Sequence, residues 1–272
     1  MPLKDKTVAV IGAGSMGEAL IRGLAKSGSV PANRLIATDI RRERLAMVAR
    51  DTGARVSSDN AHAVEEADVV VLAVKPQQMN ETLESIRGGL TPDKLVISIA
   101  AGVPTARIEA VLGGAVRVVR AMPNMAAQVG EGAAAICRGS YAAEADLAVA
   151  EAILEGVGLV VRVQESQMDA VTALSGTGPA YLFLLVEAMA RAGVEAGLAE
   201  DLARKLSVQT VVGAARLLAE TGEDPAALRR RVTSPGGTTQ AAVRVLKDGG
   251  FVELMSEAVK AAAIRSWELS GS

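Results

Sequence analysis

A glycine-rich segment near the N-terminus has the composition of a phosphate-binding turn. It reads Gly-Ala-Gly-Ser-Met-Gly at residues 12–17, after an apolar run at 7–11 and before a helical pattern at 18–27. In such a G-x-G-x-x-G pattern the glycines permit a tight turn, a close approach to a pyrophosphate and helix–strand packing. The following helix N-terminus attracts phosphates through its free N–H groups and its dipole. The pattern therefore predicts a dinucleotide site that contains Gly12, Ala13, Gly14, Ser15, Met16 and Gly17.

An acidic residue stands at the spacing expected for ribose recognition. Asp39 closes the second predicted strand, 22 residues after Gly17, where a carboxylate can accept a hydrogen bond from the ribose 2′-hydroxyl of NAD. Arg41 and Arg42 follow at once, and an arginine there can instead bind the 2′-phosphate of NADP. A strand-end carboxylate before a solvated helix start has the same pattern. The choice between NAD and NADP stays open.

Two further loops are expected at the carboxyl edge of the predicted sheet, where ligands of such sheets bind. Their small residues and prolines suit a backbone surface that lines a flat cofactor. Lys75 fits a phosphate contact and a solvated side chain equally well. The loop residues expected to contact the cofactor are Ala73, Val74, Lys75, Pro76, Ala100, Ala101 and Gly102.

Two turns rich in glycine and hydroxyl groups stand out in the second half, at residues 169–181 and 232–239. Each leads into a predicted helix, so helix capping alone could explain both. However, the Ser-Pro-Gly-Gly-Thr-Thr sequence at 234–239 offers more backbone N–H groups and hydroxyls than a cap requires. Together with a helix dipole, these groups fit a small carboxylate.

The chain contains one histidine, His62, and one cysteine, Cys137. This composition excludes an internal disulfide and a multi-thiolate metal site, and it leaves a zinc or Ser-His-Asp hydrolase no evident centre. His62 follows Asn60 at the start of a predicted short helix, where we expect a surface or capping role. We expect no metal site, and chemistry that relies on carboxylates, hydroxyls, lysines or a borrowed cofactor.

The elements that must position these residues change type along the chain. The first 160 residues or so alternate between β-branched runs and helical patterns, which predicts a mostly parallel, doubly wound Rossmann-type sheet. The predicted strands are 7–11, 35–39, 69–74, 95–99, 116–121 and 159–163, and the predicted helices are 15–27, 42–52, 60–67, 79–86, 105–112 and 142–156.

After residue 163 only helical patterns follow, at about 179–196, 199–221, 224–232, 239–248 and 251–269. The predicted fold class is therefore α/β, with a dinucleotide-binding Rossmann domain at 1–163 and an all-helical domain at 164–272. The stretch 181–192 is apolar nearly all round and requires burial on every side. We expect a second copy of the chain to cover it.

The composition excludes several classes of partner. Half of the 272 residues are hydrophobic, 22% are charged, and the net charge is −2. These values indicate a folded globule without the positive surface that binds nucleic acid. The uninterrupted apolar runs are shorter than the roughly 18–20 residues of a membrane span, and the N-terminus lacks a signal-peptide core. We expect a soluble cytoplasmic protein with neither a nucleic-acid nor a membrane partner.

Six segments, spread over nearly the whole chain, resemble the pyrroline-5-carboxylate reductase family. Those at 174–181 and 234–239 are highly characteristic of it; the others are 11–14, 73–76, 100–102 and 122–124. The resemblance implies reduction of 1-pyrroline-5-carboxylate to L-proline by NADPH or NADH, the last step of proline biosynthesis. It also implies a homodimer built through the C-terminal helices, with a decamer of dimers as a further assembly.

The resemblance also implies residue roles. Asp39 stands at the adenosine ribose, Asn60 at a further cofactor contact, and Thr239 is the catalytic residue placed to hydrogen-bond the ring nitrogen. The implied substrate-binding residues are Ser234, Gly236, Gly237, Thr238 and Thr239. This chain departs from the family at Asp39, where many relatives carry a small hydroxyl residue, which puts an NADPH preference in doubt. Thr177 replaces the commoner serine, a conservative change.

Two alternatives compete with this interpretation. A β-hydroxyacid dehydrogenase has a similar glycine loop, but such enzymes resemble one another in a catalytic lysine after a Gly-x-Gly turn. Here Gly176-Thr-Gly178 is followed by no lysine until Lys205. A non-catalytic dinucleotide-binding homologue is the other alternative, and the intact 234–239 loop argues against it.

Overall fold

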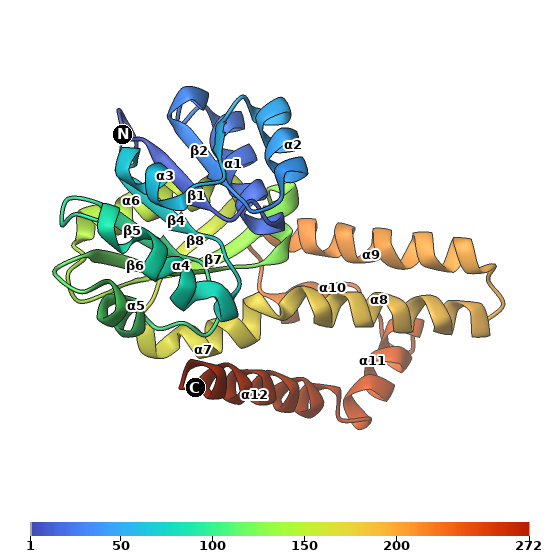
Figure 1. The fold of residues 1–272 in the computed structure, drawn as a ribbon. Coiled ribbons are helices and arrows are strands. Elements are labelled where there is room, and N and C mark those ends of the chain that lie inside the picture. Colours follow the sequence, from blue (N-terminus) through green and yellow to red (C-terminus); the bar gives the residue numbers. More distant parts are fainter. Residues whose placement is uncertain (1, 272) are drawn as a thin grey trace. The chain divides into compact units, whose positions relative to one another are not determined.

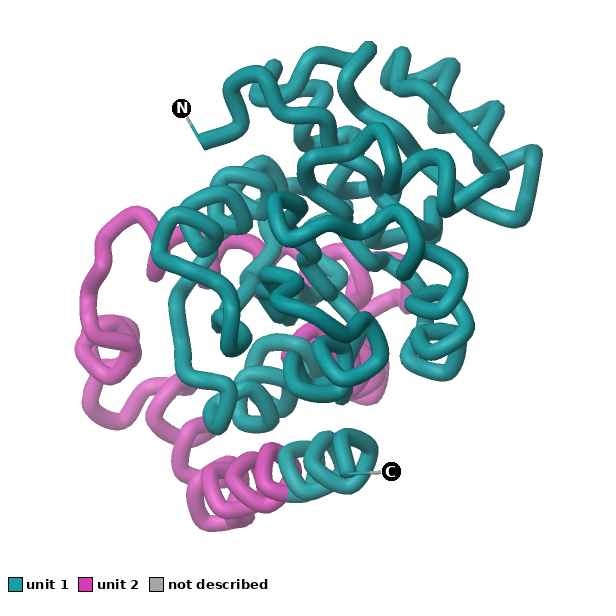
Figure 2. Tube along the Cα trace, turned by 60° about the vertical axis from the view of Figure 1, so that its left-hand side comes forward, with its two compact units in different colours: residues 1–177, 261–272 teal, residues 178–260 magenta. Residues whose placement is uncertain are grey.

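The computed structural model describes residues 2–271, which form two compact units (Figures 1 and 2). The first, called here the Rossmann unit, runs to Thr177 and includes the chain again from Ala261. The second, the helical unit, is Gly178–Lys260. The last turns of the C-terminal helix therefore belong with the Rossmann unit.

A single sheet forms the centre of the Rossmann unit. Within the described residues its strand order is β3-β2-β1-β4-β5-β6-β7-β8. All neighbours pair in parallel except β6 and β7, which are antiparallel. The strands are β1 Val8–Ile11, β2 Leu35–Thr38, β3 Arg55–Ser57, β4 Val69–Leu72, β5 Leu95–Ser98, β6 Arg117–Pro123, β7 Gly132–Arg138 and β8 Gly158–Arg162.

Helices cover both faces of this sheet, as its sequence requires. Along β1, Val8 and Val10 belong to one hydrophobic cluster, whereas Ala9 and Ile11 belong to another on the opposite face, because successive strand side chains alternate. Three helices pack on the first face and three on the second. The first set is α1 Ser15–Ser27, α2 Arg42–Thr52 and α6 Glu144–Leu154; the second is α3 Asn60–Glu66, α4 Met79–Ile86 and α5 Thr105–Leu112.

The rest of the chain is helical. The first part of the Rossmann unit ends with the 3₁₀ turn η6, the short helix α7 and the π-helical turn η7. In the helical unit, α8 and α9 pack together. At their contact, a Cβ on Gly193 would lie 3.0 Å from the Cβ of Ala203, so glycine permits the close approach. The elements are η6 Glu165–Gln167, α7 Met168–Val171, η7 Thr172–Gly176, α8 Gly178–Glu195, α9 Glu200–Thr221, α10 Pro225–Arg231, α11 Thr238–Asp248 and α12 Phe251–Ser270.

The predicted α/β fold class is confirmed, and two strands were missed. β3 spans three residues, and β7 is rich in alanine, which has low strand propensity. β7 follows β6 through the short turn η4 (Met125–Val129) rather than a crossover helix, so the two strands must be antiparallel. The predicted domain boundary at 163 remains a prediction, while the compact units divide at Thr177.

One helical run within the described residues, Glu165–Glu195, is long and apolar enough by length and composition to cross a membrane. The expectation rested on uninterrupted apolar runs, whereas this helical run includes charged residues, such as Glu187 and Arg191. Only 6% of its most apolar stretch is buried in the single chain. An apolar helix that is covered by another copy of the chain has the same length and composition.

Candidate dinucleotide and carboxylate sites

The turn between β1 and α1 has the backbone that a pyrophosphate requires. Gly12 has a φ of +98°, and a Cβ there would lie 2.8 Å from the carbonyl oxygen of Ala73. A Cβ on Gly17 would collide with the carbonyl oxygen of Gly12. Gly14, the N-cap of α1, differs because a Cβ there meets no atom within 4 Å. Open space at a helix N-terminus, beside a backbone without a side chain, fits a phosphate group.

The carboxylate of Asp39 lies at the end of β2 and is already paired. The backbone N–H and Nε of Arg41 donate to Asp39 Oδ1 at 2.9 and 3.0 Å, and Nη2 donates to Oδ2 at 3.1 Å. The Asp39 side chain is 6% exposed and that of Arg41 is 50% exposed. Burial raises the pKa of Asp39, but the hydrogen bonds from Arg41 outweigh it and hold the pKa below its ordinary value.

A second arginine, which the sequence analysis did not assign to the site, contacts the glycine turn. Arg44 in α2 donates from Nη1 to the carbonyl oxygen of Ala13 at 3.0 Å. Its Nη1 also lies 3.7 Å from Glu18 Oε2. The arginine therefore places positive charge beside the turn proposed to hold phosphates. Its place in the first turn of the predicted helix, shortly after Arg41 and Arg42, was the only signal in the sequence.

Asn60 and His62 lie at the start of α3. Thr38 donates from Oγ1 to Asn60 Oδ1 at 2.6 Å, so Asn60 is held at the end of β2, near Asp39. Asp59 caps α3 by accepting from the N–H of His62. The His62 side chain is 62% exposed, which agrees with the expected surface role.

The two predicted loops follow β4 and β5, the strands next to β1 on one side. The N–H of Ala73 donates to the carbonyl oxygen of Ile11 at 2.8 Å, which fixes loop 73–76 beside the glycine turn. Lys75 is exposed, whereas Gly102 is buried with a φ of +69°. The structure therefore brings all the predicted cofactor residues of the Rossmann unit to one sheet edge.

In the helical unit, the 234–239 loop forms a tight turn that ends in α11. The N–H of Gly237 donates to the carbonyl oxygen of Ser234 at 3.0 Å, and Gly236 has a φ of +72°. Gly237 is the N-cap of α11, so Thr238 and Thr239 occupy its first turn. Ser234 and Thr238 are exposed and Thr239 is half-buried. Hydroxyl and N–H groups at a helix start can bind a carboxylate.

Two backbone donors of this turn are occupied: the N–H of Gly237 by the carbonyl oxygen of Ser234, and the N–H of Gly236 by a side chain. The side-chain oxygen Oε1 of Gln240 accepts from the N–H of Gly236 at 2.6 Å. This places an amide side chain over part of the expected anion-binding backbone. A carboxylate that used the N–H of Gly236 would have to displace Gln240.

The characteristic segment at 174–181 begins inside the π-helical turn. Asn124 donates from Nδ2 to the carbonyl oxygen of Ser175 at 3.1 Å. A Cβ on Gly176 would lie 2.6 Å from Cε of Met122. The segments at 122–124 and 174–176, far apart in the sequence, therefore pack against each other in the Rossmann unit.

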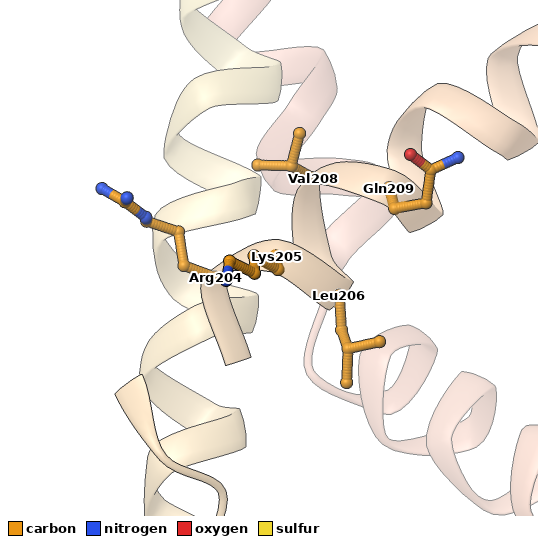
Figure 3. Close-up of a pocket in the computed structure, with 5 residues that line it drawn as sticks. All are labelled: Arg204, Lys205, Leu206, Val208 and Gln209. Atoms are coloured by element: carbon orange, nitrogen blue, oxygen red, sulfur yellow. The ribbon is translucent and has the colours of Figure 1, made fainter. Parts of the chain in front are cut away.

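The structure also contains two surface pockets that include none of the predicted site residues. One, of about 690 Å³, is lined by five residues between 204 and 209 of α9, and their side chains point in different directions (Figure 3). The other, of about 580 Å³, lies on the Rossmann unit beside α1 and residues 127–130. Within residues 2–271 no group of three or more side chains is arranged to hold a metal ion.

Comparison with known proteins decides the family. Residues 165–269 match the family model for pyrroline-5-carboxylate reductase dimerisation, and residues 7–102 match that of NADP oxidoreductase, coenzyme F420-dependent. Pyrroline-5-carboxylate reductase of Methanosarcina acetivorans is 44% identical over 267 residues, 98% of this chain and 99% of that protein. This chain belongs to the pyrroline-5-carboxylate reductase family.

Other members agree with this assignment. Pyrroline-5-carboxylate reductase of Pseudomonas aeruginosa is 44% identical over 97% of this chain and 96% of its own length. The structure of the Coxiella burnetii reductase matches with a TM-score of 0.93 at 41% identity, covering 97% of this chain and 98% of that one. The NADP-bound Plasmodium falciparum reductase matches with a TM-score of 0.87 at 29% identity, covering 98% and 99%.

The resemblance inferred from the sequence is therefore confirmed. The reductase is an oxidoreductase with an NADP-type dinucleotide domain, and its match to a dimerisation domain indicates self-association. The residue roles within its two sites remain predictions.

Proposed function

We propose that this protein reduces 1-pyrroline-5-carboxylate to L-proline in the cytoplasm, with NADPH or NADH as hydride donor. The observation that carries the proposal is the set of hydroxyl groups that the 234–239 loop places at the start of α11, with Ser234 and Thr238 exposed and Thr239 half-buried. It is a site for a small carboxylate in a chain whose other unit has a complete dinucleotide turn. We assign dinucleotide binding to residues 1–163, and substrate binding and dimerisation to residues 164–272.

The Rossmann unit has the groups that such a cofactor requires. The open backbone at Gly14 accepts the pyrophosphate, and Arg44 adds positive charge. The loops at 73–76 and 100–102 line the nicotinamide end. Asp39 and Arg41 together face the adenosine ribose, and Asn60 supports that end. When bound, the cofactor supplies the hydride.

The 234–239 loop orients the substrate. Its N–H groups and hydroxyls hold the carboxylate, and the helix dipole of α11 favours the negative charge. Thr239 hydrogen-bonds the ring nitrogen, and that bond strengthens as the nitrogen gains amine character. Held this way, the imine carbon is presented for hydride addition.

The reaction requires little acid–base machinery. Hydride adds to the imine carbon, the C=N π bond becomes the nitrogen lone pair, and one proton from solvent completes the amine. A cyclic imine is basic enough to be protonated near neutral pH, so no strong general acid is needed. Positioning the two reactants can supply several kcal/mol of the barrier reduction, with an upper limit of about 7–11. A chain with one histidine is sufficient for this chemistry.

A direct assay tests the proposal. The purified protein should oxidise NADPH or NADH when the cyclic imine is added, and Thr239→Ala should lower kcat/KM by roughly 10–150-fold. That range corresponds to a lost hydrogen bond of about 1.5–3 kcal/mol in the transition state.

Thr221→Ala is the matched control, because Thr221 bonds only within its own helix end, to the carbonyl oxygen of Leu217 at 2.7 Å and to the N–H of Glu223. It should retain wild-type kinetics. A Thr239→Ala variant within twofold of wild type would remove Thr239 from the mechanism.

We further propose that the functional assembly is a homodimer built through the C-terminal helices, with a decamer of dimers as a larger form. The side chains of Leu182, Phe183 and Leu184 in α8 are half or more exposed in the single chain. Their exposure supports an interface in which a second copy of the chain covers α8.

A further inference from the structure

The end of the C-terminal helix lies against the loop proposed to line the nicotinamide. Residues 261–271 cluster with the Rossmann unit, as the colouring of Figure 2 shows. Gly102 is buried, and a Cβ there would lie 3.4 Å from the Cβ of Leu269 and 3.8 Å from the N of Ser270. The last turn of α12 is therefore in direct contact with loop 100–104.

A partly buried hydrogen bond fixes this end of α12. Ser266 donates from Oγ to Asp169 Oδ1 at 2.6 Å, across 97 residues of sequence. Ser266 is 5% exposed, and Asp169 lies in α7. A short hydrogen bond from a hydroxyl to a carboxylate is among the stronger hydrogen bonds in proteins. It sets where α12 meets the Rossmann unit.

The segment 165–169, which contains Asp169, is also attached to the residue that follows loop 100–104. Glu165, four residues before Asp169, accepts from Thr105 Oγ1 at 2.8 Å through Oε2 and pairs with Arg120 Nη1 at 2.6 Å through Oε1. Thr105 is the first residue of α5 and follows the loop directly. Loop 100–104 is thus held between α12, at Gly102, and η6, at Thr105.

The loop has few means of fixing its own conformation. Residues 100–102 are Ala-Ala-Gly, without a polar side chain, and Gly102 adopts the left-handed conformation at φ +69°. Glycine is the residue with the greatest backbone freedom. Ala100 and Val103 anchor the loop in the core on one face of the sheet, and the contact with Leu269 of α12 adds packing at Gly102.

We propose that the last turns of α12, fixed by the Ser266–Asp169 hydrogen bond, position loop 100–102 for the nicotinamide end of the cofactor. Ser266 and Asp169 are positioning residues, and they act through Gly102 and its neighbours. The inference rests on the proposed dinucleotide site. It predicts that loosening α12 weakens contacts to the nicotinamide end and leaves the adenosine end unchanged.

Two ligands distinguish binding at the nicotinamide end of the site from binding at the adenosine end. Reduced NADPH engages the whole site, whereas adenosine 2′,5′-bisphosphate carries only the adenosine end; NADH and ADP form the equivalent pair if NADH is preferred. Dissociation constants are measured by nicotinamide fluorescence and by calorimetry on the full-length protein. Ser266→Ala should weaken NADPH binding by roughly three- to tenfold, the range of one hydrogen bond, and leave the adenosine fragment unaffected.

Matched variants show whether the bond itself matters. Asp169→Asn keeps a side-chain oxygen acceptor without the charge and should weaken NADPH binding less than Asp169→Ala, which should reproduce Ser266→Ala. Ser207→Ala is the control, because Ser207 is also 5% exposed but donates only within α9, to the carbonyl oxygen of Ala203. It should change neither dissociation constant.

Several outcomes would overturn the proposal. Equal weakening of both ligands in Ser266→Ala would mean a general loss of structure, and unchanged NADPH binding in both alanine variants would mean that α12 does not position the loop. If the wild-type protein bound neither ligand, the dinucleotide site itself would be wrong, which is a separate failure.

Discussion

Asp39 and Arg41 form an ion pair at the adenosine end of the proposed cofactor site, and the pair bears on which dinucleotide is used. Without a partner, the carboxylate would repel a 2′-phosphate by roughly 3 kcal/mol at about 5 Å and an effective dielectric of 20. The Arg41 guanidinium contacts both oxygens of Asp39 and offsets most of that repulsion. We therefore expect both cofactors to support turnover, with a preference below about a hundredfold.

Replacing Asp39 distinguishes the effect of its negative charge on cofactor preference from the effect of the Arg41 positive charge. Asp39→Ser should shift the ratio of kcat/KM values toward NADPH by about tenfold or more, because the repulsion is removed and the Arg41 fork is released. Steady-state kinetics with both cofactors measure the ratio. Asp51→Ser is the control, since Asp51 also pairs with arginines, at Arg22 and Arg50. A shift toward NADH, or none, would mean that Asp39 does not face the ribose.

Cys137 is buried against Glu165, and its thiol is protected. Burial first, and the nearby Glu165 carboxylate second, raise the pKa of Cys137 from 9.0 to about 12. The thiolate is the reactive form, so the native thiol should resist disulfide reagents at pH 8 and react once the chain is unfolded in urea. Rapid modification of the native protein would contradict this account.

The same shift predicts a pH dependence of stability. The folded state binds the thiol proton more tightly than the unfolded state, so the contribution of Cys137 is complete below about pH 9 and is lost as the pH rises from there toward 12. Urea unfolding between pH 8 and 10 should show a decline in the free energy of unfolding that is smaller in Cys137→Ala.

At the scale of elements, local signals predicted the helices better than the strands. α1 and α2 end where expected because Gly28 and Gly53 adopt left-handed C-cap conformations, which glycine favours. The strand β7 was missed because a run of alanines carries little strand signal, and its direction depends on the short connection from β6.

The candidate site also contains parts that could be predicted from the sequence and parts that could not. The glycine turn and the two loops at 73–76 and 100–102 could be predicted because each directly follows a strand. The contacts of Arg44 with Ala13 and of Ser266 with Asp169 could not, because they join residues 31 and 97 positions apart. Such long-range contacts depend on how the elements pack, and that packing cannot be read from the local pattern of a single sequence.

Glu165 connects three elements, and its removal should be costly. Arg120 is 3% exposed and its Nη1 pairs with Glu165, while Nε and Nη2 have no hydrogen-bond partner among the described residues. Glu165→Ala should lower the free energy of unfolding by about 2–4 kcal/mol, because it leaves a buried guanidinium without its counter-charge.

Urea unfolding measures this loss. Glu144→Ala is the control, because Glu144 pairs with Arg162 at 2.7 Å but is 72% exposed, and such a surface pair contributes at most about 1 kcal/mol. Equal effects of the two substitutions would show that the Arg120 pair is no stronger than a surface pair.

At the scale of the whole molecule, the two units differ in how much apolar surface they expose. The central strands β1 and β4 of the Rossmann unit are fully buried, whereas α8, α9 and α12, which runs from the helical unit into the Rossmann unit, present many exposed large apolar side chains. Exposed apolar area of this extent marks an interface. The same helices lie within the dimerisation match at 165–269. The helical unit is thus an element that a second chain completes.

A charge placed on this surface tests the dimer. The wild-type protein should have at least twice the chain mass by light scattering at micromolar concentration, the dimer being the smallest form, and Phe183→Glu should shift it toward monomer. Phe183 is 56% exposed in the single chain, and a buried, unpaired carboxylate at an interface costs several kcal/mol. Val129→Glu is the control, because Val129 is 77% exposed on the Rossmann unit, outside the dimerisation match. It should remain dimeric. A monomeric wild type, or equal dissociation of both variants, would mean that α8 does not form the interface.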